Sequence, residues 1–241
     1  MGLSTLLSPS AVSPQRTVDV GGGVDLLSPS PRLSKPDAFF PISMEGLWMC
    51  ERTVSNVEGD SFQANTVWKA LGSKASLPAS ESYLTRFIPS PYEGTDVSGY
   101  TVLDRGYEYL SRSGLSSVDW KVSEPSHLQT STTTTTSITN PKIQLDVVWR
   151  IVEMPNDQGF GSQELIKITD GPFLRAALVK RRFRRSFDAA QNRVVEGLEV
   201  VKTFRVLDGV AGTELPTSTV RSQLRFIRPR GDGYDVPSGA Y

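Results

Sequence analysis

The stretch GLWMC at residues 46–50 is the first part of the chain with the chemistry of a β-strand, and it decides the fold. Trp48, Cys50 and Val54 fall on one side of an extended chain, whereas polar residues such as Glu51 and Thr53 fall on the other. This alternation is typical of an antiparallel strand with one face in the core and the other in solvent. The sequence therefore predicts a β-sheet that begins here, with Trp48 and Cys50 turned inward.

Further strands follow along the chain, separated by turns rich in Gly, Pro, Asn and Asp. They are expected at residues 64–71, 83–88, 117–123, 143–151, 164–169, 194–207 and 219–228. In the strand at 143–151, strict alternation puts Val147 and Trp149 on the same face. One helix is expected over Tyr100 to Arg112, with Gly114 closing it. The Asp104-Arg105 pair is expected to cap or staple this helix, and the alternative is a functional ion pair at the mouth of the barrel.

Short strands with so little helix predict an all-β fold. We expect an antiparallel up-and-down barrel with at most one or two short helices. Closing the sheet into a barrel would also remove its unpaired edges.

Three regions of the chain differ in composition. Residues 1–37 are rich in Ser, Pro and Gly, and they bury too little apolar surface to offset the entropy cost of ordering. We expect a disordered leader, either a simple tail or part of an organelle transit peptide. Residues 38–228 are expected to form a single barrel domain, and residues 229–241 a flexible tail.

The composition of the whole chain excludes several kinds of site. Lys plus Arg (26) balances Asp plus Glu (26), so electrostatic binding to nucleic acid or to a membrane would have to be local. The one cysteine, Cys50, rules out an internal disulfide and is expected to be a small buried hydrophobe. The one histidine, His127, falls in an expected loop without a visible catalytic partner. These two single residues exclude most familiar hydrolase and metalloenzyme chemistry, and no stretch of about 18 apolar residues occurs. We expect a non-enzymatic protein without a metal, a cofactor or a membrane span.

Several short motifs occur in an order that resembles a known family. They are Phe39-Phe40-Pro41, Gly46-Leu47-Trp48, Val102-Leu103-Asp104-Arg105-Gly106-Tyr107, Val118 to Trp120, Asn140-Pro141, Val194-Val195-Glu196 and Lys202-Thr203-Phe204. In this order they resemble an uncharacterised calycin-like (lipocalin-type) domain of unknown function found in cyanobacteria and in plant and algal chloroplasts. The resemblance covers residues 38 to about 228. It implies a single lipocalin-type barrel and no catalytic residues. It also implies a chloroplast location, for which association with the thylakoid is one option.

The same resemblance implies structural roles for a few residues. In lipocalin-like barrels, a glycine two residues before the tryptophan of the first strand lets neighbouring backbone approach, and the indole seals one end. Gly46 and Trp48 occupy these positions. Calycin barrels often lay a cationic side chain of the last strand over this tryptophan, a contact worth about 1 kcal/mol. Arg225 is the first candidate for that cation, and Arg221 the second.

The run from Lys180 to Arg185 places five cations around one aromatic ring, Phe183. It could bind nucleic-acid phosphates and stack a base, but the balanced charge of the chain gives that interpretation no further support. In a strand, Arg181, Phe183 and Arg185 share one face, and turned inward they would line the barrel and pair with an acidic ligand head group. The preferred alternative is a solvated basic outer face.

Trp68 and Trp149 are expected in the core, where they could line a cavity for a flat apolar pigment or a lipid. We expect a plastid protein that binds such a ligand or acts as an assembly partner of a photosynthetic complex. The alternative is an enzyme of the chromophore-lyase kind that handles a tetrapyrrole, because residues 40–48 are similar to the opening of those lyases. A third hypothesis, not adopted, is an RNA-binding module that uses residues 180–185.

Overall fold

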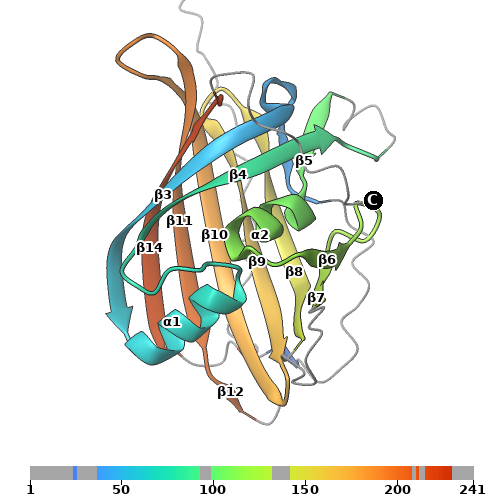
Figure 1. Cartoon of the computed structure of the whole chain (residues 1–241), viewed down its shortest axis with the longest axis vertical. Helices are drawn as coiled ribbons and strands as arrows, with labels where there is room; N and C mark the ends of the chain where they lie inside the picture. Colours follow the sequence, from blue (N-terminus) through green and yellow to red (C-terminus); the bar gives the residue numbers. More distant parts are fainter. Residues whose placement is uncertain are drawn as a thin grey trace, which may run out of the picture.

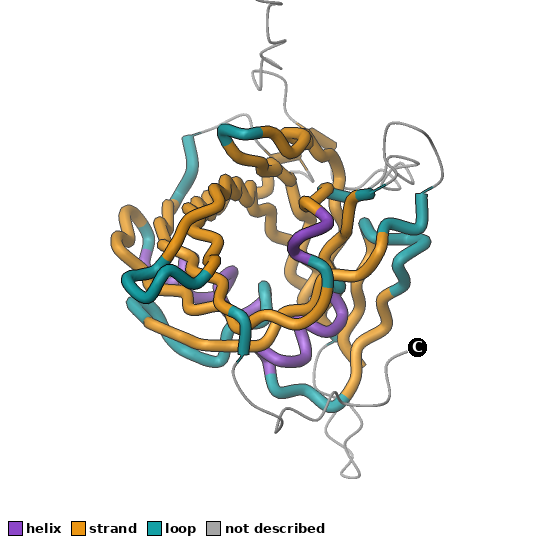
Figure 2. Tube along the Cα trace, turned by 90° about the horizontal axis from the view of Figure 1, so that it is seen from above, coloured by secondary structure: helices purple, strands orange, loops and turns teal. Residues whose placement is uncertain are grey.

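The computed structural model describes residues 24–25, 37–92, 99–131, 142–207, 210–211 and 215–229. Most of these residues form one antiparallel sheet of 11 strands, which curls into a barrel-like shape (Figures 1 and 2). Its strands are β2 (Phe39–Pro41), β3 (Gly46–Gly59), β4 (Ser80–Pro89), β5 (Tyr100–Leu103), β6 (Ser117–Trp120), β7 (His127–Ser131), β8 (Ile143–Asn156), β9 (Gly159–Asp170), β10 (Phe173–Phe187), β11 (Arg193–Phe204) and β14 (Ser218–Ile227). The other elements are β1 (Val24–Asp25), β12 (Val206–Leu207) and β13 (Val210–Ala211), which form a small second sheet, the 3-10 turn η1 (Ile42–Met44), and the helices α1 (Ser61–Ala70) and α2 (Arg105–Ser113).

The order of strands in the large sheet is β2-β5-β4-β3-β14-β11-β10-β9-β8-β7-β6. Strands β8 to β11 pair in sequence, and the long strands β3 and β14, far apart in the chain, pair side by side. This arrangement confirms the predicted all-β, barrel-like fold with two α-helices. Within the described residues the ladder is not closed by hydrogen bonds, because β2 and β6 remain its edges and α2 packs between β4 and β6. The expected removal of both edges is therefore wrong.

Helix α1 occupies residues that were expected to form a strand. The carboxylate of Asp60 caps its first turn by accepting hydrogen bonds from the backbone N–H groups of Phe62 and Gln63, both at 3.0 Å. Ala64, Val67 and Trp68 follow the helical spacing of three and four residues, and all three are buried. The helix packs against β3, β9, β11 and β14, and so covers the lower end of the barrel in Figure 1.

Helix α2 begins later than the sequence indicated, because Tyr100–Leu103 pairs with β2 and β4 as strand β5. The side chain of Asp104 accepts a hydrogen bond from the backbone N–H of Tyr107 at 2.9 Å, which confirms the expected cap. Gly114 ends the helix with a φ of 67°, a left-handed conformation that favours glycine.

A bulge in β8 changes which side chains face the interior. The pairing of β8 with β9 shifts between Val147 and Trp149, so one extra residue enters β8 there. Val147 packs inside the barrel, whereas Trp149 packs against an apolar cluster on the outer side of β9 and β10. The predicted inward position of Trp149 is therefore wrong, because an extra residue reverses the alternation. The same shift turns Arg150 inward, where it pairs with Glu164.

The end of the barrel opposite α1 is closed by aromatic side chains. Trp48 is 4% exposed, and its indole N–H donates to the carbonyl oxygen of Met44 at 2.6 Å. Phe40, Phe160 and Phe183 stack beside it in one core, with ring centroids 5.3–5.7 Å apart. The predicted sealing role of Trp48 fits this arrangement.

The cation over Trp48 is Arg228 and not Arg225. The Arg228 guanidinium lies 4.1 Å from the centroid of the indole ring. Arg225 faces outward on β14 and pairs at 3.3 Å with Glu51, the residue directly opposite on β3. Arg221, the second candidate, is also exposed and lies 4.0 Å from Glu58. Both predictions are wrong because the antiparallel register places the position across from Trp48 one residue beyond the end of β14. Gly46, with a φ of 94°, lies directly under the Arg228 guanidinium.

The expected leader (1–37) and tail (229–241) lie almost wholly outside the described residues. In the described part of the chain, no helix is both long and apolar enough to cross a membrane.

Candidate functional site: a charged cavity inside the barrel

A small, partly open cavity lies between α2 and the inner faces of β8 to β11. Part of its wall is apolar and includes Leu103, Leu128 and Val147. Four arginines and three glutamates form the rest, together with the half-exposed His127. The space open to the centres of water-sized spheres is ≈ 70 Å³. That is room for roughly five waters, given about 10–15 Å³ for each.

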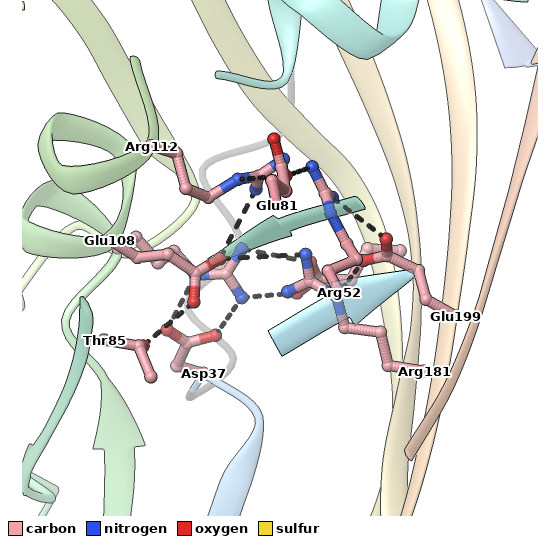
Figure 3. Close-up of polar contacts among 10 residues, drawn as sticks. Asp37, Arg52, Glu81, Thr85, Glu108, Arg112, Arg181 and Glu199 are labelled. Carbon is pink, nitrogen blue, oxygen red and sulfur yellow. Dashed lines mark hydrogen bonds and ion pairs between the residues drawn. The ribbon is translucent and has the colours of Figure 1, made fainter. Parts of the chain in front are cut away.

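Six buried or partly buried charges near this cavity form a closed ring of alternating sign, which we call the charge ring (Figure 3). In order around the ring its members are Arg52, Glu199, Arg181, Glu108, Arg112 and Glu81. The strongest links join Glu199 to Arg181 at 2.7 Å and to Arg52 at 3.1 Å, and Arg52 also bonds Glu81. Three positive and three negative charges make the ring neutral, which is how charged groups persist in a protein interior.

Backbone geometry explains why these residues meet. Arg52 lies two residues after Cys50 on the inward face of β3, and Glu199 on β11 is directly opposite Arg181 on β10. Glu108 and Arg112 are four residues apart in α2, so they share the helix face that looks into the barrel. Thr85 on β4 donates to Glu108 at 3.0 Å and fixes that carboxylate.

A second set of buried charges lies beside the ring. Arg105 donates to both carboxylate oxygens of Asp37 and of Glu164, at 2.5–3.0 Å. Arg150 contacts the same two acids, 3.3 Å from Asp37 and 2.5 Å from Glu164. The two arginines and two acids again cancel in charge.

The pairing shifts the pKa values of the ring. Burial alone would raise the pKa of Glu199, but attraction to Arg181 and Arg52 outweighs it and lowers that pKa to about 2. Burial would lower the pKa of Arg181, yet Glu199 and Glu108 raise it well above its usual value. Glu164 is likewise ionised, because Arg105 and Arg150 lower its pKa despite burial. Glu199 and Glu164 therefore stay ionised in the interior.

Among the members of the charge ring, Arg112 has the most hydrogen-bond donors without a partner among the described residues. It is 6% exposed and lies 3.5 Å from Glu108 and 3.7 Å from Glu81, beyond hydrogen-bonding distance for either pair. Its Nε and one terminal nitrogen have no hydrogen-bond partner among the described residues. Buried donors without a partner are uncommon in proteins and call for a bound water or ligand.

The predicted ligand-binding residues are placed in different parts of the molecule. Arg181 faces the cavity as expected. Phe183 shares its face of β10 but belongs to the aromatic core around Phe40 and Phe160. Trp68 is buried in α1 and stacks under the Arg52 guanidinium, 3.7 Å from the centroid of the ring, without lining the cavity.

Arg185 does not face the cavity, which corrects the prediction for that residue. Strand β10 extends past the aromatic core, so Arg185 is exposed and lies beside a surface pocket at the Trp48 end. Arg182 and Arg184 are on the outer face, where Arg184 pairs with Glu196 at 2.8 Å. This placement agrees with the preferred interpretation of a solvated outer face.

The one cysteine and the one histidine of the chain lie in different environments. Cys50 is fully buried and burial raises its pKa to about 12, as suits a small hydrophobe. His127 does have a partner, since its Nδ1 lies 2.7 Å from Asp146, directly opposite on β8. His127 begins β7 and does not lie in the expected loop, and its pairing with Asp146 depends on the register of β7 and β8, which no local sequence pattern predicts.

Comparisons with known proteins identify the family of the chain. Neither a search of curated proteins nor a search of solved structures finds a match. Residues 32–230 match the family described as Domain of unknown function (DUF6816). This match agrees with the expected uncharacterised domain and includes every residue of the charge ring. The chain therefore belongs to the DUF6816 family.

Proposed function

We propose that the protein is a non-enzymatic binder of a small organic acid, held inside the barrel with its carboxylate on Arg112. The observation that carries this proposal is the pair of buried Arg112 nitrogens without hydrogen-bond partners in the described chain, in a side chain that lines the cavity. Satisfying such donors is worth about 1–3 kcal/mol each, which favours an occupant that accepts hydrogen bonds.

A carboxylate suits the site because a guanidinium presents N–H groups in a planar fork that matches two carboxylate oxygens. Arg112 is held only loosely by its ring partners, so a ligand can take up its free donors without breaking the tight Arg181–Glu199 and Arg52–Glu199 links. The apolar wall formed by Leu103, Leu128 and Val147 would contact the carbon chain of the same ligand.

The size of the cavity narrows the expected ligand class. A pigment, a tetrapyrrole or a two-chain lipid is far larger than the ≈ 70 Å³ of free space. An acid with a short carbon chain fits. Such a ligand also has the acidic head group that was expected from the inward position of Arg181. A chromophore-lyase role would require a much larger opening of the barrel, so we do not propose it.

Calorimetric titration and thermal unfolding with a chain-length series of acids test the proposal. The probes are formate through hexanoate, with the corresponding primary alcohols as neutral controls. We expect saturable binding of the short acids and none of the alcohols. At 100 times its dissociation constant, the best acid should raise the free energy of unfolding by about 2.7 kcal/mol.

The variant Arg112→Lys keeps the charge but loses the fork, and should weaken acid binding. Arg182→Lys makes the same change on the exposed outer wall and should leave binding unchanged. The proposal fails if no acid binds, if alcohols bind equally well, or if a folded Arg112→Lys protein binds as tightly as the parent.

We further propose a chloroplast location, supported by the resemblance to plastid and cyanobacterial domains and by the composition of residues 1–37. The full chain with a fluorescent protein at its C-terminus should accumulate in plastids of a plant or algal cell, and a chain starting at residue 38 should not. Equal distribution of both fusions would contradict this location. An assembly role with a photosynthetic complex then requires co-purification of complex subunits with the full-length fusion.

A further inference from the structure

We propose that the Trp48 end of the barrel docks onto an anionic lipid surface through Arg185, Arg193 and Arg228. The site is a surface pocket floored by Met44, Trp48 and Val194, with ≈ 510 Å³ open to the centres of water-sized spheres. All three arginines line it, and among the described residues no carboxylate does. This local excess of positive charge is notable in a chain whose total charge is zero.

Arg228 supplies a fixed cation at the pocket wall. Its guanidinium stacks over the Trp48 indole at 4.1 Å, and it donates to the carbonyl oxygens of Leu47 and Ser43, both at 3.2 Å. These contacts hold the charge in one place before any ligand arrives, which lowers the entropy cost of binding.

Arg185 and Arg193 complete the cationic side from the ends of β10 and β11. Neither forms a hydrogen bond or ion pair with any described residue, although both lie near the turn that contains Asp188. The Asp188 carboxylate is used within that turn, where it accepts hydrogen bonds from Ala190 and Asn192 at 2.8–3.2 Å. Partial burial lowers the pKa of Arg228, and the exposed carboxylate of Glu45 acts in the opposite direction. Within the part of the chain that the structure describes, these two guanidinium groups of Arg185 and Arg193 therefore have no protein partner and are available to phosphate.

Exposed apolar side chains accompany these cations. Phe187 lines the pocket and is 62% exposed, and Ile42, next to the pocket residue Ser43, is 53% exposed. Both are large hydrophobic side chains beside basic ones, the combination by which peripheral proteins insert into the interface of an anionic bilayer. A free polyanion such as RNA would gain nothing from Ile42 in a chain without net charge.

Vesicle flotation with the full-length protein tests the proposal. The probes are vesicles of phosphatidylcholine alone and vesicles that also contain phosphatidylglycerol, at low and at physiological salt. We expect binding to the anionic vesicles only. The double variant Arg185→Gln/Arg193→Gln should weaken that binding by about 30-fold, since each basic residue at such a surface contributes about five- to sixfold. Phe187→Ser should also weaken it, with less sensitivity to salt.

The matched control is Arg182→Gln/Arg184→Gln, which removes the same charge from the outer wall of β10, where both arginines already face acids. It should bind nearly as well as the parent protein. Circular dichroism and thermal unfolding establish that each variant is folded.

The proposal is overturned if the parent protein ignores anionic vesicles, or if both double variants lose binding equally. It is also overturned if millimolar inorganic phosphate releases the protein, because the pocket would then be a site for a free anion. Since the pocket and the interior cavity share no lining residue, Arg112→Lys should leave vesicle binding unchanged.

Discussion

At the scale of single residues, Glu199 is the side chain on which charge compensation inside the barrel most depends. This carboxylate is 2% exposed and lies between Arg181 and Arg52, so it neutralises two buried cations at once. Removing one member of a buried ion pair leaves a charge without compensation, which costs more than the pair itself contributes.

We therefore expect Glu199→Gln to lower the free energy of unfolding by about 3–5 kcal/mol. Urea denaturation measures the loss. The matched control is Glu196→Gln on the outer face of the same strand, whose exposed pair with Arg184 is worth about 1 kcal/mol at most. Similar losses in the two variants would show that burial of the ring has no energetic consequence.

The lowered pKa of Glu199 also makes the stability of the protein depend on pH. The pKa of Glu199 is about 2 in the folded protein and close to 4.5 once unfolding exposes it. A lowered pKa in the folded state stabilises the protein above pH 4.5, and this contribution disappears as the pH falls from about 4.5 towards 2. The loss is on the order of 3 kcal/mol. Unfolding free energies measured from pH 6 to pH 2 should therefore fall less steeply for Glu199→Gln than for the parent.

Arg228 makes the other decisive contact of a single side chain. Arg228→Ala should lower the free energy of unfolding by about 1 kcal/mol, because the cation–π contact over Trp48 is lost. Arg225→Ala should cost about 0.5 kcal/mol or less, since its pair with Glu51 is roughly half exposed. Thermal unfolding of the two variants distinguishes them, and the reverse order would restore Arg225 as the important cation.

At the scale of elements, the sequence predicted strands well and failed where local signals competed. The predicted inward position of Trp48 and Cys50 is correct, and the strand expected at 219–228 forms as β14, with Val220, Leu224 and Phe226 buried. Residues 64–71 were misread because Val67 and Trp68 favour strands, while the cap that selects a helix, Asp60, lies outside that window. The bulge in β8 leaves no trace in the sequence, and so the direction of Trp149 could not be inferred from alternation.

The cap of α1 gives a test at this scale. Asp60→Ala should destabilise the protein by about 1 kcal/mol, because two backbone N–H groups lose their acceptor. Glu58→Ala, two residues earlier and exposed, should have a much smaller effect in the same denaturation experiment. No difference between them would mean that α1 contributes little to closing its end of the barrel.

At the scale of the whole molecule, the candidate site could be predicted only in part. Arg181 could be predicted as an inward site residue because its neighbours form an alternating strand. Arg52, Glu108 and Arg112 could not, since charged residues at inward positions look like surface residues in a sequence. Their partners come from β4, β10, β11 and α2, and only the folded barrel brings these elements together. A signal was present in Arg52, which has the same parity as Trp48 and Cys50.

Cys50 reports on the opening of the entire barrel. Because it is fully buried and its pKa is raised to about 12, a thiol reagent should modify it only when the protein unfolds globally. The labelling rate should rise with urea in parallel with the unfolded fraction measured by circular dichroism. Rapid labelling in buffer without urea would mean that the barrel opens locally at β3.

The charge ring also has a consequence for how the chain finds its native pairing. If β11 slipped by one residue against β10, Glu199 would turn to the outside and leave Arg181 and Arg52 in the interior without their shared anion. Each stranded cation would make the slipped arrangement several kcal/mol less stable, even though its apolar residues could still be covered. The six charges thereby select the native strand register, because they destabilise misfolded arrangements that hydrophobic burial alone would tolerate.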